Sequence, residues 1–173
     1  LIHRDAPTAG LGGAVVEGLR AAASNWCLVM DGDLQHPPED VPRLLARADR
    51  DDVDVVVASR YIAGGDSKGL ADATRTTVSR ASTLLTKSMF PRKLGDCSDP
   101  MTGFFLVNRD AIDIDALRPR GFKILLEILA RRHRRVGEVP FAFASRFAGA
   151  SKASFTQGIR FLTQLLMLRF GRM

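Results

Sequence analysis

Residues 26–33 read WCLVMDGD, an apolar run that ends in two carboxylates separated by one glycine. An uninterrupted apolar run of this length predicts a buried strand, because a strand with one solvated face would alternate apolar and polar residues. Residues two apart on a strand project to the same side. Asp31 and Asp33 are therefore expected to point the same way at the carboxyl end of a strand, where open α/β sheets bind their ligands.

Helical and strand-like segments alternate on both sides of this run. Apolar spacing predicts a helix over residues 8–24 and another over residues 38–48, followed by a β-branched strand over residues 53–58. Further helices are expected over residues 73–90, 110–117, 122–133 and 153–170, and further strands over residues 103–108 and 136–143. This alternation predicts an α/β domain built on a mostly parallel sheet.

Composition excludes several classes of protein. The chain has 173 residues and is 46% apolar, which is enough for one substantial core and argues against a disordered chain. Cys27 and Cys97 have neither disulfide-framework nor zinc-site spacing. No apolar run approaches the ~20 residues that cross a bilayer, so we expect no membrane-spanning segment within this sequence.

The formal net charge of +6 is unevenly distributed. Residues 1–117 carry 13 Lys and Arg against 17 Asp and Glu, whereas residues 118–173 carry 12 against 2. The basic side chains after Glu138 are interspersed with Phe, Leu, Ile and Met. This mixture is typical of a surface that meets an anionic membrane. We expect residues 153–173 to form an amphipathic helix at such an interface, with packing of this helix against the core as the alternative.

Asp31, Asp33 and the nearby Gln35 amide form a cluster of hard oxygen ligands. Such oxygens suit Mg²⁺ or Mn²⁺ carrying a diphosphate. The same tripeptide is also typical of a solvated turn, and an aspartyl phosphatase likewise ends an apolar strand in Asp-x-Asp. The phosphatase is disfavoured because no hydroxyl residue follows at the expected place, whereas the turn stays open.

The longer stretch over residues 31–39, DGDLQHPPE, resembles the metal-binding segment of the family 2 glycosyltransferases that make polyprenol-phosphate sugars. Six other parts of the chain match that family's pattern in its order: residues 10–18, 58–65, Arg75 with residues 79–80, 99–105, 121–129 and the basic loop 146–152. The resemblance implies a GT-A-like, Rossmann-type sheet flanked by helices, with the catalytic domain over residues 1–152. It also implies that the family's N-terminal nucleotide-binding strands are absent from this sequence.

The resemblance further implies an enzyme that moves a hexose from a nucleotide sugar to polyprenyl or dolichyl phosphate, with inversion at the anomeric carbon. Mg²⁺ or Mn²⁺ is the implied cofactor. GDP-mannose is the favoured donor and UDP-glucose the alternative. The implied location is the cytoplasmic face of a membrane, where the protein is peripheral or is tethered by a region outside this chain.

The same resemblance assigns roles to individual residues. The metal ligands are Asp31, Asp33 and Gln35, the catalytic residues are Asp99, Arg75 and Arg60, and the substrate-binding residues are Ser79, Arg80, Arg146 and Lys152. Two anionic phosphates must approach one carbon in this reaction, and guanidinium groups with a metal offset their repulsion. The acceptor phosphate is already anionic near neutral pH, so Asp99 is expected to position the sugar rather than to remove a proton.

Two other functions remain open. A family 2 transferase with a saccharide acceptor would keep the Asp31 and Asp33 site, and a non-enzymatic basic module would bind membrane or nucleic acid instead. The basic run over residues 131–135 lacks the interleaved aromatic side chains of a single-strand binder, so no nucleic-acid partner is expected. His36, Trp26 and Tyr61 are interpreted as packing residues.

Overall fold

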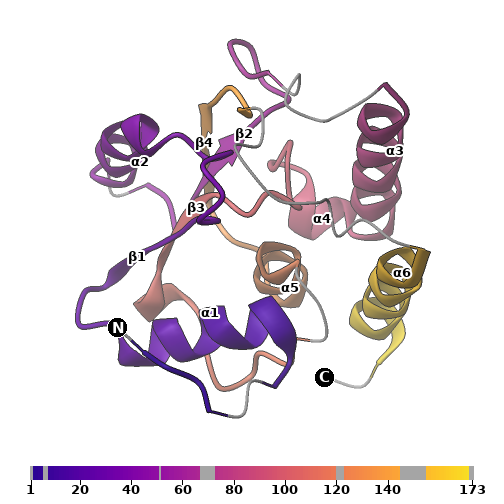
Figure 1. The fold of residues 1–173 in the computed structure, drawn as a ribbon, viewed down its shortest axis with the longest axis horizontal. Helices are drawn as coiled ribbons and strands as arrows, with labels where there is room; N and C mark the ends of the chain where they lie inside the picture. The colour runs from indigo at the N-terminus through magenta and orange to yellow at the C-terminus, as the bar shows by residue number, and fades with distance from the viewer. Residues whose placement is uncertain are drawn as a thin grey trace.

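The fold is taken from a computed structural model that describes residues 2–5, 8–50, 52–66, 73–119, 123–144 and 155–171. Its four strands are β1 (Trp26–Val29), β2 (Val55–Ser59), β3 (Phe105–Asn108) and β4 (Val136–Pro140), in the sheet order β1-β3-β2-β4. The helices are α1 (Gly10–Ala21), α2 (Val41–Ala48), α3 (Ala73–Met89), α4 (Pro91–Leu94), α5 (Ile124–Arg131) and α6 (Phe155–Phe170). Two short 3-10 turns, Pro38–Asp40 and Arg109–Ala111, precede α2 and follow β3. Figure 1 shows helices on both sides of the sheet.

The sheet is mixed, so the expectation of a mostly parallel sheet was wrong for the described strands. β2 pairs with β4 in parallel, but β3 runs antiparallel to both β1 and β2. The chain enters β3 from the edge where β1 and β2 end. Ser98 precedes β3 in the sequence, and its hydroxyl oxygen lies 2.5 Å from that of Ser59, the last residue of β2. Alternating helices and strands predict the layers but do not specify the direction of each strand.

Strand β2 is the buried centre of the fold, and its two faces pack against different helices. Val55 and Val57 join a core with side chains of α1, α4, α5 and α6, whereas Val56 and Ala58 pack on the α2 side with Leu44. Alternate residues of a strand point to opposite faces, so one five-residue strand contributes to both cores. Every residue of β2 is buried.

Two other expectations were wrong. β1 is partly exposed rather than buried, because it lies at the edge of the described sheet, and Leu28 is 37% exposed there. The helix expected over residues 110–117 is only the turn Arg109–Ala111. Its aspartates compete with helix formation, since the Asp113 carboxylate accepts a hydrogen bond from the backbone N–H of Ala116.

One edge of the sheet is marked out by topology. β1, β2 and β4 all end there, and the loop over residues 99–103 leads into β3 from the same side. The carboxyl ends of parallel strands are where α/β sheets place ligands.

The helices within the described part of the chain are too short or too polar to span a bilayer.

Candidate active site

The Asp-Gly-Asp turn begins two residues after the end of β1 and is held by hydrogen bonds between backbone N–H groups and side chains. The Asp31 N–H donates to Nδ1 of His36 at 2.9 Å, and the Asp33 carboxylate accepts from the backbone N–H of Gln35 at 3.2 Å. Leu34 has a positive φ of 62°, which turns the chain back between these contacts. Asp31 and Asp33 are both partly exposed, so their carboxylates lie in a fixed turn that solvent reaches.

Gly103 allows the loop before β3 to approach this turn closely. A Cβ atom at position 103 would lie 3.1 Å from Oδ2 of Asp31 and 3.3 Å from Cε1 of His36. Both distances are tighter than ordinary van der Waals contact, so a side chain there would displace the Asp31 carboxylate. Gly103 thereby joins the acidic turn to the loop that carries Asp99.

His36 is a packed aromatic residue, in agreement with its interpretation from the sequence. Its ring stacks on Phe104 with centroids 5.1 Å apart, and the rings of Phe141 and Phe143 lie within 5.8 Å. Burial lowers the pKa of His36, although the nearby aspartates act in the opposite direction. A neutral imidazole accepts the Asp31 N–H, so His36 orients the turn rather than binding a metal.

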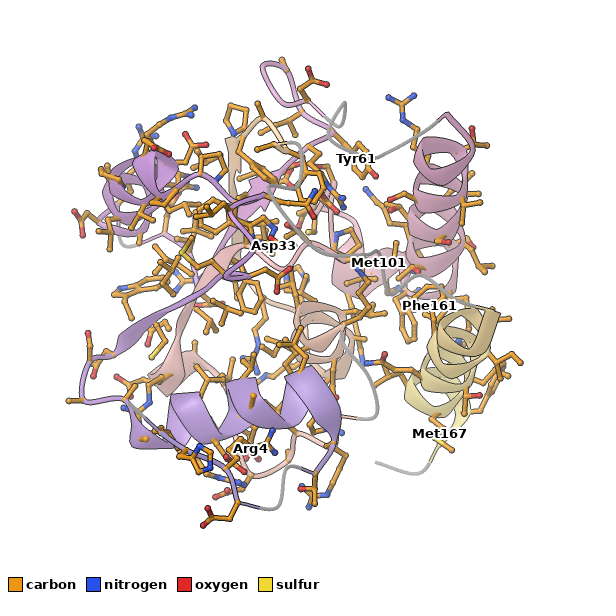
Figure 2. The ribbon with its side chains drawn as sticks, viewed as in Figure 1. Arg4, Asp33, Tyr61, Met101, Phe161 and Met167 are labelled. Atoms are coloured by element: carbon orange, nitrogen blue, oxygen red, sulfur yellow. The ribbon has the colours of Figure 1, made fainter. Side chains whose placement is uncertain are left out.

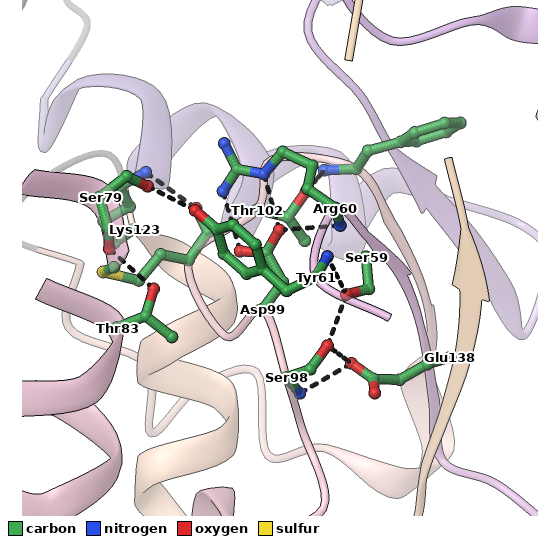
Figure 3. A network of polar contacts seen from close by, with 12 residues as sticks. Ser59, Arg60, Tyr61, Ser79, Thr83, Ser98, Asp99, Thr102, Lys123 and Glu138 are labelled. Carbon is green, nitrogen blue, oxygen red and sulfur yellow. Dashed lines mark hydrogen bonds and ion pairs between the residues drawn. The ribbon is translucent and has the colours of Figure 1, made fainter. Parts of the chain in front are cut away.

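Arg60 and Asp99 form a buried ion pair beyond the end of β2 (Figure 3). Arg60 Nε lies 2.7 Å from Asp99 Oδ2 and Arg60 Nη2 lies 2.9 Å from Oδ1, a two-point contact of the planar guanidinium with the carboxylate. The side chains are 9% and 0% exposed. Burial alone would lower the pKa of Arg60, but the hydrogen-bonded carboxylate outweighs it and raises that pKa. Arg60 therefore keeps its positive charge although it is buried.

Tyr61 connects this pair to helix α3, which it faces in Figure 2. Its hydroxyl lies 2.7 Å from the Ser79 hydroxyl. The guanidinium carbons of Arg60 and Arg80 lie 5.2 Å and 6.0 Å from the centre of its ring. Thr83, one turn further along α3, donates its hydroxyl to the Ser79 carbonyl. Tyr61 thus organises two cations and a hydroxyl, a role that its interpretation as a packing residue missed.

Lys123 is a further site residue that sequence reasoning did not identify. Its ammonium donates to the Met101 carbonyl at 2.8 Å, in the loop that carries Asp99. Burial and the neighbouring Arg60 lower the pKa of Lys123 to about 8, while Asp99 and Asp31 oppose that shift. The signal in the sequence was a single lysine at the start of a run that is apolar except for Glu127.

The side-chain oxygens of the acidic turn suit a small divalent cation that takes its remaining ligands from substrate. The described residues hold no group of three His, Cys, Asp or Glu side chains that could bind a metal. Mg²⁺ commonly takes only one or two carboxylates, with phosphate oxygens and waters as its other ligands. Asp31 and Asp33 meet that requirement. Gln35 is 6% exposed and its side-chain N–H donates to the Ala144 carbonyl at 3.1 Å, which fixes the amide beside them.

The predicted site residues are thus only partly brought together. The structure gathers Asp31, Asp33 and Gln35 on one side and Arg60, Asp99, Ser79 and Arg80 on the other. Arg146 and Lys152 lie outside the described residues, as does the Arg75 side chain, so their predicted roles stay predictions.

The basic run over residues 131–135 is partly used in ion pairs. Arg131 pairs with the buried Glu127 one turn earlier on α5, and Arg135 pairs with Asp54 beside the start of β2. Those two arginines are therefore engaged in ion pairs within the fold, and only part of the run is left to meet a partner.

Residues 1–114 match the sequence profile of Glycosyl transferase family 2. Three similar proteins are each named dolichol-phosphate mannosyltransferase. The one from Pyrococcus furiosus is 38% identical over 83% of this chain and 40% of its own length. Those from Saccharomyces cerevisiae and Mycosarcoma maydis are 40% and 35% identical over 94% of this chain, and 62% and 56% of their own lengths. This chain thus spans roughly half the length of these relatives.

Two solved structures share the fold. The crystal structure of Mycobacterium tuberculosis glucosyl-3-phosphoglycerate synthase in complex with Mn²⁺, UDP and glucosyl-3-phosphoglycerate superposes with a TM-score of 0.60 at 19% identity, covering 92% of this chain and 55% of that one. A crystal structure of a mycobacterial protein reaches 0.65 at 19% identity, covering 98% and 53%. They confirm the expected GT-A-like α/β fold, and at these identities they show the fold alone.

Proposed function

Because the chain belongs to glycosyltransferase family 2, we propose that it forms part of a metal-dependent enzyme that transfers mannose from GDP-mannose to dolichyl or polyprenyl phosphate. The names of the three relatives support the sugar and the acceptor. Residues 1–152 would belong to the catalytic domain, and the activity is proposed for the whole protein of which this chain is a part.

One observation carries the proposal: an acidic turn and a cationic cluster meet at the same edge of the sheet. Asp31 and Asp33 follow β1, and Arg60 with its partner Asp99 lies beyond the end of β2. The loop over residues 99–103 contacts both through Asp99 and Gly103. This arrangement suits a reaction in which a metal-bound diphosphate and a second phosphate approach one carbon.

On the donor side, Asp31 and Asp33 would hold Mg²⁺ or Mn²⁺, and His36 and Gln35 would keep their turn in place. The bound cation supplies charge neutralisation for the departing diphosphate. The predicted contribution of Arg146 and Lys152 is to clamp that diphosphate from the other side.

On the acceptor side, Arg60, Ser79 and Arg80 would bind the lipid phosphate, together with Arg75. Asp99 fixes the plane of the Arg60 guanidinium, and its role in positioning the sugar stays a prediction. Tyr61 contacts the Ser79 hydroxyl and lies against the guanidinium groups of Arg60 and Arg80. The acceptor oxygen forms a bond to the anomeric carbon while the bond from that carbon to the diphosphate oxygen breaks. A single displacement of this kind inverts the configuration, and an already ionised phosphate needs no general base.

We further propose that α6 lies at the cytoplasmic surface of a membrane, where a polyprenyl phosphate would be met. Its exposed apolar side chains include Ile159, Leu162, Leu166 and Phe170, the last 73% exposed. Arg169 lies next to them, so the helix joins apolar and cationic surface as interfacial helices do.

The experiment uses membranes that contain the full-length protein and added dolichyl phosphate. Radiolabelled GDP-mannose and UDP-glucose are supplied in parallel, with Mg²⁺ and with EDTA. We expect label from GDP-mannose in an organic-extractable lipid, only with the cation. Label in a water-soluble saccharide would favour the saccharide-acceptor alternative, and transfer that persists in EDTA would contradict the proposed metal site.

A further inference from the structure

Lys123 is held at both ends by contacts to other parts of the fold. Its ammonium donates to the Met101 carbonyl at 2.8 Å, and its own backbone carbonyl accepts from the Gln164 side chain on α6 at 3.3 Å. Gln164 is only 4% exposed. Fixing a lysine side chain costs rotamer entropy, so these two contacts hold Lys123 in one conformation against that cost.

The loop that Lys123 contacts is the one that touches both halves of the site. Its first residue, Asp99, pairs with Arg60, and its last, Gly103, packs against the Asp31 carboxylate. Met101 lies between them and presents the carbonyl that accepts the ammonium. A shift of this carbonyl would therefore move the donor and acceptor sides of the site relative to one another.

The charges around Lys123 belong to the same two halves. Asp99 and Asp31 stabilise its charged form, whereas Arg60 and burial oppose it, and the pKa of about 8 reflects that balance. An ammonium beside two carboxylates offsets their mutual repulsion in a region of low dielectric constant. A methionine of similar length would avoid the desolvation cost but would remove this positive charge from the neighbourhood of both carboxylates.

We propose that Lys123 is a positioning residue of the transfer reaction: it fixes the loop over residues 99–103 through the Met101 carbonyl, and so sets the placement of Asp31 relative to the Arg60–Asp99 pair. This role rests on the proposed function, because it concerns the distance between the metal-bound donor and the acceptor phosphate. Misplacement of reacting groups by about 1 Å can cost on the order of 100-fold in rate.

Lys93 provides a matched control. Its ammonium also donates to backbone carbonyls, those of Ala130 and Arg131 at 2.6 and 3.0 Å, at the opposite end of α5. Burial likewise lowers its pKa. Both lysines therefore fasten α5 to another segment, but only Lys123 faces carboxylates of the site.

The test compares Lys123→Met, Lys123→Arg and Lys93→Met in the full-length protein. We measure kcat, KM for each substrate and the Mn²⁺ concentration that half-saturates transfer, and record thermal unfolding. For Lys123→Met we expect kcat to fall about 10- to 100-fold and the half-saturating Mn²⁺ concentration to rise severalfold, with partial recovery in Lys123→Arg. Lys93→Met should lower Tm but leave kcat, both KM values and the half-saturating Mn²⁺ concentration unchanged.

The proposal is overturned if Lys123→Met resembles Lys93→Met, with a lower Tm but wild-type kcat and Mn²⁺ dependence in the folded fraction. If Lys123→Met does not fold, Gln164→Leu loosens the same residue from its other end, and unchanged kinetics there would equally overturn it. Mn²⁺ binding in the presence of GDP, followed by electron paramagnetic resonance, separates the two proposals. A wild-type protein without lipid transfer would contradict the proposed function, whereas weakened Mn²⁺ binding in Lys123→Met would still support positioning.

Discussion

Strand β2 has an Arg–Asp pair at each end, and the two pairs differ mainly in burial. Beyond its last residue, Arg60 forms two short bonds with Asp99, and the side chains are 9% and 0% exposed. Beside the start of β2, Arg135 Nη2 lies 2.8 Å from Asp54 Oδ1, and the two side chains are 59% and 18% exposed. The same kind of ion pair is therefore shielded from solvent at one end of β2 and exposed to solvent at the other.

The difference in burial distinguishes an ion pair that only accompanies the fold from one that a functional site requires. An exposed pair gains little, because water and salt screen it and two side chains must be ordered. A buried pair costs so much desolvation that apolar side chains of similar volume often stabilise a fold equally well. Stability alone therefore does not explain Arg60 and Asp99, whereas a site that must hold a guanidinium in one plane does.

The largest effect is expected from breaking the buried pair. Asp99→Ala leaves Arg60 as an uncompensated buried charge and should lower the free energy of unfolding by about 3–5 kcal/mol, with loss of transfer. Asp54→Ala should have a severalfold smaller effect and retain transfer. Urea unfolding of the full-length variants measures the loss of unfolding free energy in each. Equal losses for Asp99→Ala and Asp54→Ala would contradict the distinction between the buried and the exposed pair.

A large effect on activity without loss of stability is expected from Asp33→Asn. The substitution keeps the oxygen that accepts the Gln35 N–H but removes the negative charge offered to the cation. Transfer should fall by about 100-fold or more, because electrostatic stabilisation of the departing diphosphate is lost. Asp40→Asn is the control, since Asp40 pairs with Arg43 at 2.6 Å and should tolerate the change. Comparable activities of the two variants would argue against the acidic turn as the metal site.

A smaller effect is expected from Tyr61→Phe. The ring stays in place against Arg60 and Arg80, but the 2.7 Å contact with Ser79 is lost. A hydrogen bond of this kind contributes about 0.5–1.5 kcal/mol, so KM for the acceptor should rise about threefold to tenfold. A double-mutant cycle with Ser79→Ala isolates the contact, and fully additive effects would show that the two hydroxyls act independently.

The smallest effect concerns the exposed pair and its pH dependence. Burial would raise the pKa of Asp54, but hydrogen bonds from Arg135 outweigh it and lower the pKa below its ordinary 3.8. A carboxyl whose pKa is depressed by folding stabilises the protein above its unfolded pKa and loses that contribution as pH falls. The stability difference between wild type and Asp54→Ala should be constant above about pH 5 and shrink below 3.8. A difference that grows on acidification would contradict this sign.

The acidic side of the site could be predicted from the sequence because its chemistry is local. A strand and the turn that ends it place Asp31 and Asp33 without help from distant residues, and Gln35 follows within the same turn. The membership of Arg60 and Asp99 in the site came from the family resemblance. Their pairing is a tertiary contact between residues 39 positions apart, which no periodicity encodes.

Lys123 and Tyr61 were missed for the same physical reason. Lys123 reads as the first residue of an apolar helix, and its site environment comes from the loop around Met101, 22 positions away. Tyr61 reads as a packing aromatic, and its hydroxyl partner lies on α3. The antiparallel direction of β3 likewise depends on where the chain enters the sheet.

The most direct test of the proposed metal site is a crystal structure of the full-length protein with Mn²⁺ and GDP-mannose, with the cation located by anomalous scattering. We expect a single strong peak in contact with carboxylate oxygens of Asp31 and Asp33 and with the diphosphate of the donor. A bound nucleotide sugar whose Mn²⁺ lies away from both carboxylates would contradict it.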